Sequence, residues 1–203
     1  WHNTYLADER APGYGQLLED LLDDLTDRGA TLGPVSPPPT AVSSVSRQRV
    51  VHLTSVHRPR DVRIFHKEAT AVARAGGHAA VLGLATPARR AGRILAGLRL
   101  MRHAATLPAD IYHVHDPELL PGALVLARRT GTPVVYDVHE YLGQTTRTKR
   151  WLPAPLRAPL AWAAERVETA LAARLDGVVA VNADLAARFA RAGSARVTSV
   201  TNA

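Results

Sequence analysis

Residues 109–142 read ADIYHVHDPELLPGALVLARRTGTPVVYDVHEYL and contain two short apolar runs separated by a helical pattern. The apolar runs, Ile111–Val114 and Val134–Asp137, have the length of buried strands. Residues 118–130 between them have helical spacing, and Gly131 is a stop signal. A strand, a helix and a second strand in this order form a right-handed crossover between parallel strands. This stretch therefore predicts one unit of a parallel sheet covered by helices.

The same alternation continues on both sides of this unit. Further strands are predicted at Val50–Thr54, Ala79–Leu84, Val178–Val181 and Val197–Val200, with helices near 62–75, 88–106, 156–175 and 183–192. The predicted fold is α/β, a doubly wound, Rossmann-like parallel sheet over residues 49–203, which is a usual domain size.

A different composition precedes this domain. Residues 16–28, QLLEDLLDDLTDR, carry leucines at helical spacing with an acidic opposite face. Residues 34–48 are rich in Pro and Ser without a period, which is typical of an extended linker. We therefore expect residues 1–33 to be the helical C-terminal tail of an upstream domain, because so few residues cannot bury a core alone.

The composition and the absence of certain motifs exclude several kinds of binding site and several classes of enzyme. The absence of Cys excludes disulfides, thiolate metal sites and Cys nucleophiles. No G-x-G-x-x-G, P-loop or G-x-S-x-G pattern occurs where dinucleotide binding, NTP hydrolysis or an α/β hydrolase would need it. Residues 1–46 carry seven acids and two bases, whereas residues 47–203 carry eleven acids and 23 bases. The first segment therefore has a net charge of −5 and the segment with the predicted α/β domain a net charge of +12, which together give the +7 of the chain.

Polar and ionisable side chains follow four of the predicted strands. In a parallel sheet the carboxyl ends of the strands meet at one edge, where ligands bind. We therefore predict a site there, with His139 and Glu140 as catalytic residues. The predicted substrate-binding residues are Asp61, Arg63, Lys67, His115, Asp116, Glu118 and Asn182. We assign no metal ligands.

Several of these residues also have structural explanations. Asn182 or Asp184 can cap the following helix, and Asp116 with Pro117 and Glu118 suits a helix start. Three residues lie within or close to strands and are expected to be structural, namely His52, His113 and Asp137.

Three stretches together resemble a known family. They are VVHLTSVHRPRDVRIFHKEATAVARAGGHAAVL (50–82), the segment 109–142, and ARLDGVVAVNADLAARFARAG (173–193). They resemble the N-terminal domain of family 4 retaining glycosyltransferases, which have the GT-B fold of two facing Rossmann-like domains. Many members carry Gly-Gly-x-Glu after the first strand, where this chain has residues 60–65, RDVRIF.

The resemblance implies a division of labour. The N-terminal domain binds the acceptor, and a C-terminal domain holds the nucleotide sugar through a Glu-x7-Glu region. Since the chain ends at Ala203, about where the family passes into its second domain, we expect the donor domain to be missing and this fragment to be inactive alone. His139 matches a family position that reaches the transferred sugar.

The expected function is therefore the acceptor-binding half of a retaining glycosyltransferase of the hexosyltransferase type, with a glycan or lipid-linked acceptor. We expect no cofactor in this fragment, a nucleotide-sugar donor in the full enzyme, and no nucleic-acid partner. The expected location is cytoplasmic, with peripheral contact to an anionic membrane surface. That contact is predicted from helix 88–106, where Ile94, Leu95, Leu98 and Met101 would pack on the sheet and the arginines would face outward. The alternative is that the arginines form a solvated face without a membrane partner.

Two alternatives remain from the residues alone. His113, His115 and Asp116 with Asp137, His139 and Glu140 could converge on one cation in a metal-dependent hydrolase, although the two first histidines need not face one point. A non-catalytic basic binding module is the other alternative.

Residues 1–33 resemble the C-terminal end of polysaccharide deacetylase-like domains.

Overall fold

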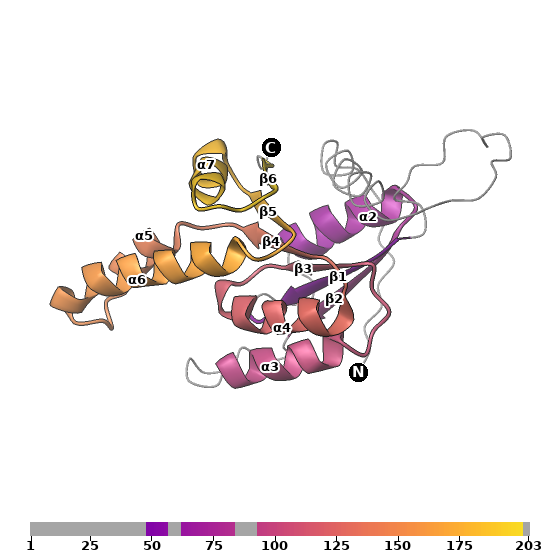
Figure 1. Cartoon of the computed structure of the whole chain (residues 1–203), viewed down its shortest axis with the longest axis horizontal. Helices are drawn as coiled ribbons and strands as arrows, with labels where there is room; N and C mark the ends of the chain where they lie inside the picture. The colour runs from indigo at the N-terminus through magenta and orange to yellow at the C-terminus, as the bar shows by residue number, and fades with distance from the viewer. Residues whose placement is uncertain (1–47, 57–61, 84–92, 201–203) are drawn as a thin grey trace, which may run out of the picture.

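The computed structural model describes residues 48–56, 62–83 and 93–200. These residues form a six-stranded, all-parallel sheet with helices on both faces (Figure 1). The predicted α/β, Rossmann-like class is thereby confirmed, and the architecture is consistent with one half of a GT-B fold. The expected tail and nearly all of the expected linker lie outside the described residues, as does Asp61.

The strands are β1 (Arg49–Thr54), β2 (His78–Gly83), β3 (Ile111–Val114), β4 (Val134–Val138), β5 (Gly177–Ala180) and β6 (Val197–Ser199). The helical elements are the π-helix η1 (Val62–Ala69), α2 (Thr70–Arg74), α3 (Arg93–Ala104), the 3-10 turn η3 (Pro117–Leu119), α4 (Leu120–Thr130), α5 (Leu142–Arg147), α6 (Ala154–Ala172) and α7 (Ala183–Arg191).

The strand order in the sheet is β2-β1-β3-β4-β5-β6. The chain moves outward from β1 to β2, returns to the other side of β1 as β3, and then continues in one direction. The order therefore reverses between β1 and β3. In open parallel sheets a ligand crevice forms beyond the carboxyl ends of the strands at such a reversal.

The two faces of the sheet are covered differently. Val51, Tyr112 and Tyr136 point to the face covered by α3, α4, α6 and α7, where most of the apolar core lies. Val50 and Ile111 point to the opposite face, which packs against α2. Figure 1 shows α2 on one side of the sheet and α3 with α4 on the other. Alternation along each strand thus assigns neighbouring residues to opposite layers.

The predicted strands and helices are found with small changes at their ends. Segment 62–75 divides into the π-helix η1 and the short helix α2, whereas the sequence pattern predicted one helix. The short helix α5 was not predicted. Gly131 ends α4 in the left-handed region at φ 67°, as a helix stop requires.

The predicted orientation of α3 is wrong in part. Met101 is buried as expected, but the side chains of Leu95 and Leu98 are 55% and 46% exposed. The helix packs through Leu100, Met101 and Ala104 against the core instead. Because its leucines cover more than one stripe of the helix, periodicity could not show which stripe the sheet would bury.

Candidate functional site

A row of polar side chains crosses the face of the sheet under η1, at its carboxyl edge. His52 on β1 pairs in register with His113 on β3. Asp137 on β4 points to the same face two residues beyond Val135. His115 and His139 continue this alternation just past β3 and β4. Strand alternation alone therefore gathers five ionisable side chains on one face.

The π-helix η1 supplies two more ionisable groups, Arg63 and Glu68, from above this row. Arg63 donates from Nε to Glu68 Oε1 at 3.1 Å, across five residues of the chain. That spacing equals the i to i+5 repeat of a π-helix, a form that often occurs at functional sites. Arg63 also donates from Nη2 to Asp137 Oδ1 at 2.9 Å, which ties η1 to β4.

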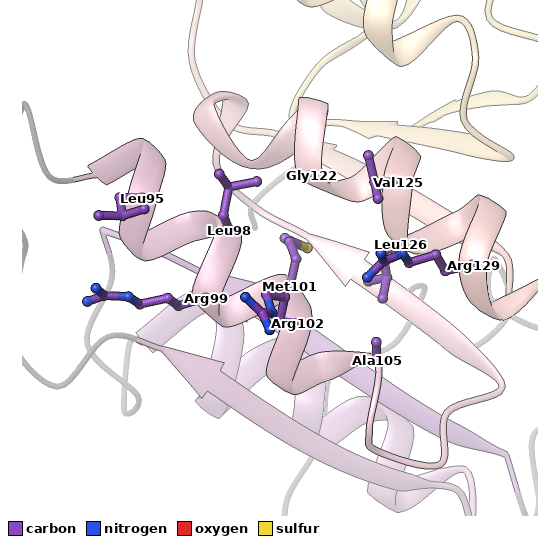
Figure 2. A pocket seen from close by; sticks show the side chains of 10 residues that line it. All are labelled: Leu95, Leu98, Arg99, Met101, Arg102, Ala105, Gly122, Val125, Leu126 and Arg129. Carbon is purple, nitrogen blue, oxygen red and sulfur yellow. The ribbon is translucent and has the colours of Figure 1, made fainter.

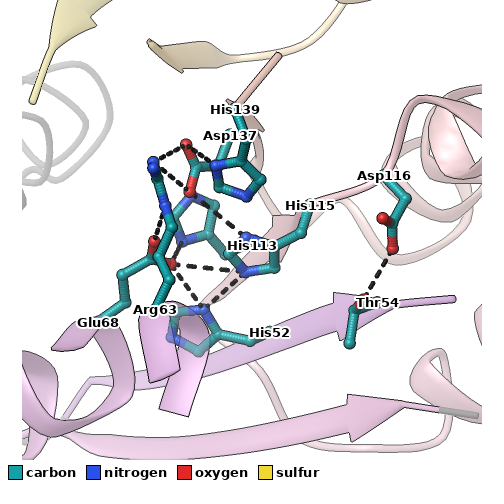
Figure 3. Close-up of polar contacts among 9 residues, drawn as sticks. All are labelled: His52, Thr54, Arg63, Glu68, His113, His115, Asp116, Asp137 and His139. Carbon is teal, nitrogen blue, oxygen red and sulfur yellow. Dashed lines mark hydrogen bonds and ion pairs between the residues drawn. The ribbon is translucent and has the colours of Figure 1, made fainter. Parts of the chain in front are cut away.

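The four imidazoles stand close together in this cluster (Figure 3). The rings of His113 and His115 have centroids 4.7 Å apart, so the two side chains do face one point. His115 and His139 stack at 5.6 Å, with 10° between their planes. His139 Nδ1 lies 3.5 Å from Asp137 Oδ1, and its side chain is 17% exposed, whereas that of Asp137 is fully buried.

Burial and neighbouring charges set the protonation of the cluster. Burial lowers the pKa of His113 to about 3 and that of His52 well below its usual range, so both are neutral near pH 7. Burial and the Asp137 carboxylate raise the pKa of Glu68. Burial alone would also raise the pKa of Asp137, but the imidazoles of His115 and His139, with ring nitrogens 3.4 and 3.5 Å from its oxygens, hold it well below its usual range. Asp137 is therefore the persistent negative charge of the site.

Asp116 joins the ends of β1 and β3 at the point where strand order reverses. Its Oδ2 accepts from Thr54 Oγ1 at 2.7 Å, from the Ser55 amide at 2.6 Å and from the Val56 amide at 3.3 Å. The side chain makes no capping bond to the helix that follows. The explanation of Asp116 as a helix cap is therefore wrong, because its carboxylate points across to β1.

Other predicted site residues surround this edge at different depths. Glu118 accepts from Ser55 Oγ at 3.2 Å, next to the Asp116 anchor. Asn182 caps α7 by accepting from the Leu185 amide at 2.8 Å, as the structural explanation predicted, and also faces the Tyr141 hydroxyl at 3.3 Å. Glu140 is exposed and accepts from Thr145 Oγ1 at 3.1 Å. Lys67 is exposed on η1. Their roles in substrate binding and catalysis stay predictions.

The cation arrangement considered for a hydrolase is only partly found. His113, His115, Asp137 and His139 converge, whereas Asp116 turns away from them toward Thr54 (Figure 3). Glu140 is also directed elsewhere, since it accepts from Thr145. Within the described ranges, two groups have ligand atoms close enough to share a metal ion. One comprises His52, Glu68, His113 and His115, and the other comprises His115, Asp137 and His139.

Glu68 was not singled out from the sequence, and His52 was expected to be structural. A usable signal existed for His52, because β1, β3 and β4 each carry an ionisable residue on the same face of the sheet. No comparable signal marked Glu68. Its direction depends on the π-helical geometry of η1, which a pattern of 3.6 residues per turn does not predict.

Comparison with known families agrees with this architecture. Residues 46–203 match the family described as the glycosyl transferase 4-like domain. The match covers most of the chain, so the chain belongs to this family, as the resemblance in its motifs indicated. No curated protein gave a significant match to the chain. Among the described helices, none is both long and apolar enough to cross a membrane.

Proposed function

We propose that this chain is the acceptor-binding half of a retaining glycosyltransferase that moves a sugar from a nucleotide-sugar donor to a glycan or lipid-linked acceptor. Family membership supports the transferase class. The observation that carries the rest is the cluster at the switch-point edge, where the partly exposed His139 stands beside the ionised Asp137. In parallel α/β sheets this edge is where substrates bind.

His139 is the residue assigned to the reaction centre. The Asp137 carboxylate, 3.5 Å away, orients the imidazole and favours a proton on the nitrogen facing it. Arg63 fixes that carboxylate from the other side. A histidine held in this way can hydrogen-bond to the transferred sugar as charge develops on the leaving phosphate, and positioned donors of this kind supply much of the rate in such transfers.

The acceptor would lie over the ends of β1 and β3. Asp116 keeps the first residues after β1 in place through two backbone amides, and Glu118 is adjacent. A substrate rich in hydroxyl groups is oriented by hydrogen-bond donors and acceptors that are held in fixed positions. The donor would bind to a second domain, so the 203-residue chain alone is expected to show no turnover of nucleotide sugars.

A second surface supports a lipid-linked acceptor. Helices α3 and α4 border a groove of about 450 Å³ on the face away from η1, lined by Leu95, Leu98, Met101, Gly122, Val125 and Leu126 with three arginines, Arg99, Arg102 and Arg129 (Figure 2). Exposed leucines beside cationic side chains suit the interface of an anionic bilayer. Exposed tryptophans commonly anchor proteins at a bilayer interface. Trp151 and Trp162 are exposed but do not line this groove.

The test of the proposed function uses a protein that joins this chain to a donor-binding domain. It should transfer sugar from one of a panel of nucleotide sugars with retention of anomeric configuration. His139→Ala should lower turnover roughly ten-fold to a thousand-fold, the scale of losing one positioned polar group. His78→Ala is the matched control, because His78 is exposed at the opposite, amino end of the sheet. Equal turnover in wild type and His139→Ala would assign His139 a structural role.

A further inference from the structure

One oxygen of Glu68 occupies an unusual position among the buried histidines. Glu68 Oε2 lies 3.7 Å from His52 Nδ1, 3.9 Å from His113 Nδ1 and 3.6 Å from His115 Nε2. All four side chains are buried. Oε2 itself is shielded from solvent and makes no hydrogen bond within the part of the chain that the structure describes. A buried carboxylate oxygen without a bond is costly, so this position calls for a positive partner.

The three distances to Oε2 are too long for hydrogen bonds but suit shared coordination. Good N–H···O bonds span about 2.7–3.2 Å. In a tetrahedral zinc site with bonds of about 2.0–2.1 Å, neighbouring ligand atoms are separated by about 3.3 Å. The three distances to Oε2 are somewhat longer than this value. The hydrogen bond between His52 Nδ1 and His115 Nε2, at 3.1 Å, is slightly shorter. The four ligand atoms lie within 4.8 Å of one another.

We propose that His52, His113, His115 and Glu68 form a binding site for one divalent transition-metal ion of the zinc class. Three imidazole nitrogens and one carboxylate oxygen are ligands that zinc and related ions accept in tetrahedral geometry. Because all four ligands are buried and complete the coordination, the ion is structural rather than catalytic. It fastens η1, through Glu68, to β1 and β3.

The surroundings of the four ligands fit a cation. The Nδ1 atoms of His52 and His113 both face Glu68 Oε2, at 3.7 and 3.9 Å. Asp137 Oδ2 lies 3.4 Å from His115 Nδ1, on the far side of that ring from Glu68. In zinc sites a carboxylate commonly stands behind a ligating imidazole in this way and orients the ring.

The charge balance points the same way. Glu68 and Asp137 are two buried carboxylates, and Arg63 bonds to both of them. One guanidinium compensates one carboxylate, and a divalent ion among the three imidazoles would stabilise the ionised form of the second. The inference goes beyond the proposed sugar transfer, since the ion's role is to hold η1 on the sheet.

The first experiment titrates zinc into the untagged chain after chelator treatment, by calorimetry. We expect one ion per chain. Loss of a residue that only hydrogen-bonds to a metal ligand typically weakens metal binding about 10- to 100-fold. Because His52 is itself a proposed ligand, His52→Gln should weaken zinc binding by at least that factor. His78→Gln, at an exposed histidine remote from the cluster, should bind zinc as the wild type does. Unchanged binding by His52→Gln, or no binding by the wild type, would overturn the proposal.

A second measurement uses the wild-type protein alone and therefore does not depend on whether a variant folds. Zinc added to wild-type protein with labelled histidines should shift the side-chain NMR signals of the ligating residues among the nine histidines. Those ligands are expected to be His52, His113 and His115. Shifts confined to exposed histidines, or to His115 and His139 without His52, would place the ion elsewhere and refute this site. Neither measurement depends on sugar transfer, so failure of one proposal is distinguishable from failure of the other.

Discussion

At the scale of single residues, the edge of the sheet is organised by buried carboxylates that accept from several donors. Asp137 holds Arg63 and stands beside two histidines. One oxygen of Asp116 accepts hydrogen bonds from a hydroxyl and from two backbone amides at the end of β1. Both acids lie close to the carboxyl end of a strand. Each therefore fixes the loop or helix that meets the strand end, and with it the shape of the candidate site.

Removing the Asp116 carboxylate tests this anchoring role. Asp116→Ala leaves the Thr54 hydroxyl and the Ser55 amide buried without their acceptor, each costing about 1–3 kcal/mol. We expect the free energy of unfolding in urea to fall by about 2–4 kcal/mol. Asp116→Asn keeps one oxygen acceptor and should cost less.

Asp184→Ala is the matched control, because Asp184 is exposed in the first turn of α7. Its loss should cost less than about 1 kcal/mol, the value of one charge at a helix end. A similar small cost at Asp116 would contradict the anchoring role.

At the scale of elements, α3 and α4 approach closely because one of them has a glycine at the contact. A Cβ at Gly122 of α4 would lie 2.8 Å from Met101 Cγ of α3. The same pair of helices forms the apolar groove with its arginine rim. The separation of α3 and α4 therefore determines the width of the groove.

Gly122→Leu should force the two helices apart and destabilise the fold by about 1–3 kcal/mol, the usual cost of overpacking. Shortening the opposing side chain should relieve that clash. In a Met101→Ala background the penalty is expected to shrink by about 1 kcal/mol or more, a coupling typical of residues in contact.

Val125→Leu, at an exposed position of the same helix, should change stability little. Strictly additive effects of Gly122→Leu and Met101→Ala in thermal or urea unfolding would show that the two residues do not restrict the helix separation.

The contact of α6 with β4 and α7 makes stability depend on pH. Glu168 on α6 accepts from the Tyr136 hydroxyl and from Arg188 Nη2, each at 2.9 Å. Burial raises the pKa of Glu168 although both bonds oppose the rise. The folded chain thus binds this proton more tightly than the unfolded chain. The resulting stabilisation is complete below the unfolded pKa and is lost as pH rises through the folded pKa.

Glu168→Gln removes this titration and keeps the side-chain shape. We expect the stability of the wild type relative to the variant to decline as pH rises from about 4 to about 7, measured by urea unfolding at each pH. Glu165→Gln is the matched control, because it removes a more exposed α6 carboxylate that lies 3.6 Å from the same arginine. A wild-type advantage that grows over this pH range would contradict the raised pKa.

At the scale of the whole molecule, the two faces of the sheet carry different surfaces. The polar cluster lies under η1, whereas the groove with Arg99, Arg102 and Arg129 lies on the face covered by α3 and α4 (Figures 2 and 3). A bilayer against α3 and α4 would therefore leave the η1 side of the sheet uncovered. The molecule can be tested for this orientation without knowing its substrate.

Sedimentation with liposomes tests the membrane contact. Each arginine near an anionic surface is worth about 1 kcal/mol, so three should give roughly a hundred-fold preference for anionic over neutral vesicles at low salt. Replacing Arg99, Arg102 and Arg129 by Gln should abolish that preference.

The control replaces Arg147, Arg166 and Arg191, which are exposed on α5, α6 and α7 and change the net charge equally. Equal loss of binding in both triple variants would mean that overall charge, not the groove, attracts the protein to the membrane.

The parallel sheet, the family and the edge at which polar residues collect were all predictable from patterns along the chain. Apolar runs and helix stops are local signals, so β3, α4 and β4 were predicted almost to their ends. The cap at Asn182 was predictable for the same reason, because its partner lies three residues away.

The contacts between groups that are distant in the chain could not be predicted in this way. Glu68 reaches three histidines from two strands because η1 is a π-helix, and Asp116 turns to β1 rather than to its own helix. Leu95 and Leu98 stay exposed because α3 buries a different stripe against the core. Periodicity gives the face on which a residue lies, whereas its partner across the fold depends on packing between segments distant in the chain.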